Sequence, residues 1–70
     1  MIKPIISQEA FDGLENIRSS GTTNMLDYPK VLHLSNLYGF EATANWLTDH
    51  KGEYGRGIFF GFEVENDPIS

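Results

Sequence analysis

The sequence predicts a mainly α-helical domain of three to four helices, because its apolar residues recur at helical spacing in three successive segments. Each of these segments is followed by a glycine at the point where a helix would end. The connectors that contain these glycines are short. The helices are therefore expected to pack as a compact bundle, in one domain spanning residues 1–70.

The first helix is expected at about Gln8 to Ser20. Ser7 is a suitable N-cap, and apolar residues recur at three-residue spacing as far as Ile17. Gly21 follows, and glycine readily adopts the left-handed conformation that ends many helices.

The second helix is expected to begin at Asp27, with Pro29 in its first turn, where the missing N–H costs nothing. Gly39 is expected to end it. A third helix is expected over residues 40–51, which read FEATANWLTDHK, and Gly52 is expected to end this one.

Residues 53–64 fit two patterns. Their apolar side chains can be placed on a helical stripe (Tyr54, Ile58, Phe59, Phe62) or on alternating positions of a strand (Ile58, Phe60, Phe62, Val64). Three glycines in this stretch are costly inside a helix. We favour a short fourth helix after Gly52. The alternative is a strand that pairs, as in a hairpin, with residues 2–6, where Pro4 restricts pairing to an edge. Residues 1–6 and 64–70 are expected to be loosely attached ends.

Composition narrows the class of protein. A chain of 70 residues buries only about 60% of its unfolded surface, so a homodimer is a reasonable way to gain stability. The absence of cysteine excludes disulfides and thiolate zinc sites and favours a cytoplasmic location. No segment has the length of a membrane span or a signal peptide. The net charge of −5 opposes binding to nucleic acid and to anionic membranes, so neither is an expected partner.

The connector after Gly21 is polar. The hydroxyls and backbone N–H groups of Thr22, Thr23 and Asn24 are of the kind that binds anions or other small ligands. The same residues also suit a purely structural corner, because Asn24 favours an Asx turn and Met25 can pack beneath it. We favour the structural corner, with small-ligand binding as the alternative.

Much of the chain follows a recognisable order: an arginine-bearing helix, a Gly-Thr-Asn-Met corner, a helix ending in a Gly-Phe turn, and a tyrosine and an Ile-Phe pair before a glycine. The matching positions are Arg18, Gly21, Thr23, Asn24, Met25, Val31, Gly39, Phe40, Tyr54, Ile58, Phe59 and Gly61. In these positions the chain resembles a family of short uncharacterised bacteriophage and prophage proteins, known only as a domain of unknown function. Gly55 and Gly57 depart from the family pattern, which has fewer glycines there. The resemblance implies a phage origin and a mainly helical domain, and it brings no activity with it.

No catalytic or metal-binding pattern stands out. His33 and His50 are the only histidines, and a metal site would have to combine His50 with carboxylates such as Asp49 or Glu53. The second and third helices resemble a helix-turn-helix only superficially, because the third carries carboxylates and no basic residue before Lys51. We therefore expect neither an enzyme nor a cofactor, a metal ion or direct nucleic-acid binding.

These observations favour a small phage accessory protein that binds another protein and modulates or inhibits a host or defence protein. The expected anchors are the aromatic residues Tyr54, Phe59, Phe60 and Phe62. The expected acidic rim contains Glu41, Asp49 and Glu53. Together with Glu63, Glu65 and Asp67 these carboxylates are expected to imitate the phosphates of a nucleic acid. The alternative is a structural or regulatory phage protein that associates with itself and has no host target.

Overall fold

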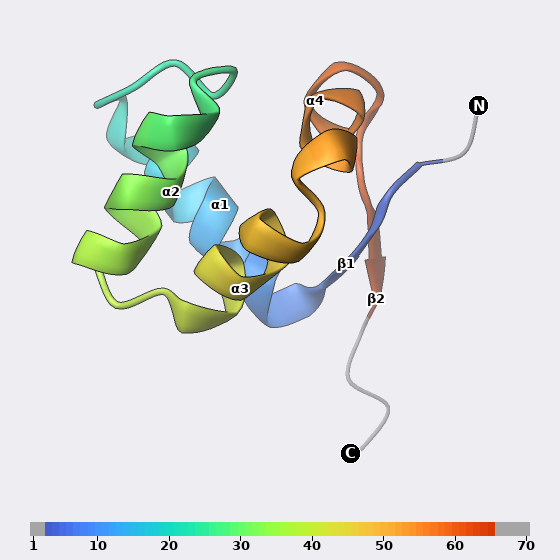
Figure 1. The fold of residues 1–70 in the computed structure, drawn as a ribbon, viewed down its shortest axis with the longest axis horizontal. Coiled ribbons are helices and arrows are strands. Elements are labelled where there is room, and N and C mark those ends of the chain that lie inside the picture. Colours follow the sequence, from blue (N-terminus) through green and yellow to red (C-terminus); the bar gives the residue numbers. More distant parts are fainter. Residues whose placement is uncertain (1–2, 66–70) are drawn as a thin grey trace.

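The computed structural model describes residues 3–65, which form four helices and a two-stranded sheet (Figure 1). In chain order the elements are β1 (Ile5–Ser7), α1 (Gln8–Ser20), α2 (Tyr28–Leu37), α3 (Glu41–Asp49), α4 (Lys51–Phe60) and β2 (Glu63–Glu65). The strands lie at one edge of the molecule and α2 lies at the opposite edge (Figure 1). The mainly helical fold class is confirmed.

Both ends of α1 form as the sequence predicts. The Ser7 side chain accepts a hydrogen bond from the backbone N–H of Ala10 at 3.2 Å. Gly21 ends the helix in the left-handed conformation, with φ of 68°, and its N–H donates to the carbonyl of Arg18. Helix α2 also begins as expected, because the Asp27 side chain caps it by accepting from the N–H of Lys30.

The third predicted helix is wrong at its C-terminal end. Helix α3 stops at Asp49, and Gly52 lies inside α4 instead of ending α3. The break falls at His50, whose φ of −127° and ψ of 37° are not helical. No glycine is needed there, because the N–H of His50 still donates to the carbonyl of Trp46 and the carbonyl of His50 accepts from the N–H groups of Glu53 and Tyr54 in α4.

The C-terminal segment contains both structures that the sequence left open, since α4 leads directly into the short strand β2. The pairing of β2 with β1 is parallel, with Ile6 opposite Val64, so the ends do not form a hairpin. The indole N–H of Trp46 donates to the carbonyl of Ile5 at 2.9 Å and ties the strand β1 to α3.

Parts of the two ends that were expected to be loosely attached pack against the rest of the domain. Ile6 is 1% exposed and belongs to the core, because β1 packs against α1 while it pairs with β2. Val64 is also packed against the core. The predicted loose tail at residues 66–70 lies outside the described residues, as do residues 1 and 2.

The core lies between α1 and the other helices. Its buried members are Ile6, Ala10, Leu14, Ile17, Val31, Leu34, Trp46, Leu47 and Tyr54. Helices α1 and α3 approach closely at Gly13, where an added Cβ would lie 2.0 Å from the hydroxyl of Thr43. That hydroxyl donates to the carbonyl of Ala10 at 2.9 Å. Within residues 3–65, no helix has the length and apolar character needed to cross a membrane.

Candidate protein-binding surface

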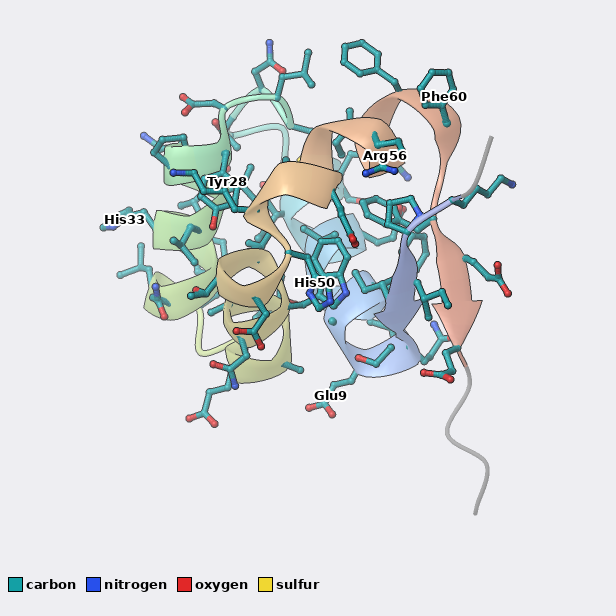
Figure 2. The ribbon with its side chains drawn as sticks, turned by 45° about the vertical axis from the view of Figure 1, so that its right-hand side comes forward. Glu9, Tyr28, His33, His50, Arg56 and Phe60 are labelled. Atoms are coloured by element: carbon teal, nitrogen blue, oxygen red, sulfur yellow. The ribbon has the colours of Figure 1, made fainter. Side chains whose placement is uncertain are left out.

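Phe59 and Phe60 form an exposed aromatic pair at the C-terminal end of α4. Their side chains are 70% and 52% exposed, and Figure 2 shows Phe60 projecting from the molecule where α4 leads into β2. Gly61 follows with φ of 98° and reverses the chain. The turn directs Phe62 inward and leaves the two preceding rings in solvent. Two of the four predicted anchors are therefore on the surface.

Phe62 is half-buried and belongs to an aromatic cluster under α4. Its ring meets the ring of Trp46 edge-on at 5.5 Å between centroids and that of Phe11 at 6.1 Å. Gly57 makes this position possible, since a Cβ there would lie 2.1 Å from a ring carbon of Phe62. Gly57 is therefore required for this packing, although glycine weakens a helix.

Tyr54 is likewise a core residue and cannot anchor a partner. It is 2% exposed, and its hydroxyl donates to the backbone carbonyl of Met25 at 2.5 Å. Burial raises the pKa of Tyr54 from 10.0 to about 12, because the phenolate would lose its hydration. The role of Tyr54 in this structure is to hold the corner between α1 and α2 against α4.

The predicted acidic rim does not lie beside the aromatic pair. Glu41, at the start of α3, lines a groove of about 320 Å³ together with Glu9 and Asp12 of α1. Asp49 is exposed at the opposite end of α3, and Glu53 is half-buried near the start of α4. The grouping of Glu41 with Glu9 and Asp12 was missed by the sequence analysis, because it depends on how α1 and α3 pack.

The polar corner is largely occupied by its own hydrogen bonds. The side-chain oxygen of Asn24 accepts from the N–H of Leu26 at 2.8 Å, which is the Asx turn expected there. The hydroxyls of Ser20 and Thr22 lie 2.9 Å apart and hydrogen-bond to each other. Thr23 is half-buried, and its hydroxyl is within 3.5 Å of the Asn24 carbonyl. The geometry accounts for these residues as structural parts of a turn.

The two histidines have different surroundings. His33 is exposed on α2, whereas His50 stacks on Trp46 with 4.5 Å between ring centroids (Figure 2). The Nδ1 atom of His50 lies 3.0 Å from the carbonyl oxygen of Trp46, so this nitrogen carries the hydrogen and donates it. In the part of the chain that the structure describes, no three His, Asp or Glu side chains are grouped to hold a metal ion.

A second feature missed by the sequence analysis is an apolar groove of about 430 Å³ between α1 and α4. Its walls include Phe11, Leu14, Met25, Ile58 and Phe62. Arg18 lies at its rim and forms an ion pair with Glu15. No pattern in the sequence indicates this groove, because its residues come from four separate segments.

The fold defines a small four-helix domain closed by a parallel pair of strands, within residues 3–65. The chain belongs to a family described as a domain of unknown function, DUF5049, whose family model matches residues 6–62. This confirms membership of an uncharacterised domain family, whereas the phage origin stays a prediction. No curated protein and no solved structure is significantly similar to the chain.

Proposed function

We propose that the chain acts by binding another protein, as a small phage accessory protein in the cytoplasm of the host cell. Its target is a host or defence protein whose activity it modulates or inhibits. The observation that carries this proposal is the exposure of Phe59 and Phe60, which lie next to each other at the end of a helix. Phenylalanine is enriched at the centres of protein interfaces and depleted on free surfaces.

The two rings suit the role of anchors because the helix that carries them is fixed from behind. Tyr54 and Phe62 hold the inner side of α4 in the core, so Phe59 and Phe60 are presented on a rigid element. A rigid anchor loses little conformational entropy on binding, which raises the affinity gained from each ring that is buried.

Charge provides a second contribution at a separate place. The net charge of −5 and the three carboxylates around the groove at Glu41 favour a target with a basic surface, such as a nucleic-acid-binding site. Acidic imitation of a phosphate track remains part of the proposal in this limited form. It predicts that binding weakens as the salt concentration rises.

The test is affinity capture of the tagged full chain from bacterial lysate at low and at moderate salt, followed by mass spectrometry. Phe60→Ala is the informative variant, and Leu37→Ala is its matched control, because Leu37 is 65% exposed on the distant helix α2. Neither substitution removes a core side chain, so both variants should fold.

We expect one host protein to be retained by the wild type and by Leu37→Ala and to be lost with Phe60→Ala. Binding of the purified pair, measured by calorimetry, should show the same order. If the wild type captures no protein specifically, or if Phe60→Ala captures the same protein equally well, the proposal is wrong.

A further inference from the structure

The outward side of α4 forms one continuous surface, which we call the α4 outer face. It consists of Gly52, Gly55, Arg56, Phe59 and Phe60. With 3.6 residues per turn these positions fall on one side of the helix, opposite the buried Tyr54 and Gly57. Arg56 and Phe60 are both exposed, and Figure 2 shows Phe60 projecting at the end of α4. Its N-terminal half contains the glycines Gly52 and Gly55, which have no side chains. Its C-terminal half contains the aromatic rings of Phe59 and Phe60.

The two glycines of this face have no explanation inside the described chain. A Cβ added at Gly52 or at Gly55 would meet no atom within 4 Å, in contrast to Gly57. Neither residue has a positive φ, since that conformation is found among residues 3–65 at Gly21, Gly39 and Gly61. Glycine weakens a helix relative to alanine, so both positions reduce stability without improving the packing of a single copy.

A second copy of the same helix fits this face when it runs in the opposite direction. If Phe59 of one copy lies over Gly52 of the other, the two-fold axis places the second Phe59 over the first Gly52. Each ring then occupies the space that the missing side chain leaves. A closed two-fold interface requires such a self-complementary surface, and a parallel arrangement would set ring against ring.

The charges favour the same arrangement. Glu53 and Arg56 lie along the same edge of the face, and Arg56 takes part in no ion pair within residues 3–65. In the antiparallel register, Glu53 lies about 3 Å along the axis from the partner's Arg56, within reach of an ion pair. The two-fold axis generates this pair twice. The parallel arrangement would instead bring Arg56 close to its own copy.

The size of the surface predicts a weak dimer. A phenylalanine buries about 150–250 Å² when fully covered, so the exposed parts of Phe59 and Phe60 supply roughly 200–300 Å² per copy. A stable interface of standard size buries about 800 Å² per partner. The remaining residues of a ten-residue helix do not close this difference, so the association must depend strongly on concentration.

We infer that the α4 outer face binds the same face of a second copy of this chain, as an antiparallel helix pair about a two-fold axis, with Phe59 over Gly52 and Glu53 against Arg56. This inference goes beyond the proposed function and is tested on the pure protein alone. The dimer covers Phe59, so a heterologous partner that uses the same rings has to compete with it.

The experiment is sedimentation equilibrium of the full chain from micromolar to millimolar concentration, starting from the monomer of 7.9 kDa. The wild type should approach twice that mass at the upper end. Gly52→Ala should weaken dimerisation at least several-fold while raising the thermal stability of the dilute monomer, and Phe59→Ala should weaken it further. Leu37→Ala on α2 should leave it unchanged.

Charge exchange tests the register. Glu53→Arg and Arg56→Glu should each weaken the dimer, and the double variant E53R/R56E should recover most of the wild-type affinity. A chain that stays monomeric at millimolar concentration overturns the inference, as does a dimer that Phe59→Ala and Gly52→Ala leave intact. Single and double charge variants of equal affinity would refute the antiparallel register. Failure to capture a host protein affects none of these results.

Discussion

Two alanine substitutions two positions apart in the same helix should change stability in opposite directions. Gly55→Ala adds a methyl group where no atom lies within 4 Å. Gly57→Ala adds the same group 2.1 Å from a carbon of the Phe62 ring, less than the roughly 3.5 Å at which carbon atoms make contact. Phe11 and Trp46 pack against this ring edge-on, so a shift of the ring away from α4 would disturb two further aromatic contacts.

The magnitudes follow from these contacts. Gly55→Ala should gain about 0.5–1 kcal/mol, which is the difference in helix propensity between the two residues. Gly57→Ala gains the same free energy from helix propensity, but overpacking against Phe62 costs about 1–3 kcal/mol. A net loss of stability of roughly 1–2 kcal/mol is therefore expected. In a domain of this size, 1 kcal/mol shifts the midpoint of thermal unfolding by about 4–8 °C.

Urea and thermal unfolding, followed by circular dichroism at a low protein concentration that keeps the chain monomeric, measure both effects. The emission of Trp46 provides an independent probe, because this single tryptophan touches the Phe62 ring. If Gly57→Ala proves as stable as Gly55→Ala, Phe62 is not held against α4, and the account of why Phe59 and Phe60 remain outside fails with it.

Three further substitutions test single hydrogen bonds. Tyr54→Phe should lose about 1–2 kcal/mol at neutral pH, because it leaves the Met25 carbonyl without its donor. In the wild type the Tyr54 phenol stays protonated up to a pH of about 12, whereas the unfolded chain releases this proton near pH 10. Stability that is complete below pH 10 should therefore fall by roughly 2 kcal/mol as the pH rises to 12. Asn24→Ala should lose about 1 kcal/mol with its Asx turn, and inorganic phosphate should stabilise neither form. Ser7→Ala should cost about 1 kcal/mol through loss of the N-cap of α1.

Each of these has a distinct contrary result, measured by unfolding in urea. An equal decline of the wild type and Tyr54→Phe between pH 10 and 12 would show that other groups cause the alkaline loss. Stabilisation by phosphate that disappears in Asn24→Ala would restore the corner as a ligand site. An unchanged midpoint in Ser7→Ala would mean that the bond to Ala10 contributes nothing.

The parts of the fold that could be predicted are those fixed by neighbouring residues in the chain. Ser7 and Gly21 determine the ends of α1 through contacts within three or four residues, and both were predicted correctly. The break at His50 was not, because the residue at the break is neither glycine nor proline and no local pattern marks it. The parallel strand pair joins residues 58 positions apart, beyond the reach of any local pattern.

The candidate binding surface could likewise be predicted only in part. The density of aromatic residues after Tyr54 was visible in the sequence, but their placement inside or outside was not. That placement depends on Gly61, which turns the chain so that Phe62 returns beneath α4 while Phe59 stays outside. Residues 53–64 fitted both a strand-like alternation and a helical spacing, because α4 ends at Phe60, inside this stretch.

The three glycines of α4 separate what the fold needs from what it does not. Gly57 is required, because Phe62 fills the space where its side chain would be. Gly52 and Gly55 occupy open positions and weaken the helix without any gain that the described residues can account for. A loss of helix stability that packing within one copy does not offset indicates a contact with another molecule. For this reason we regard the outer side of α4, rather than the polar corner or the acidic groove, as the part of the molecule where function should be sought first.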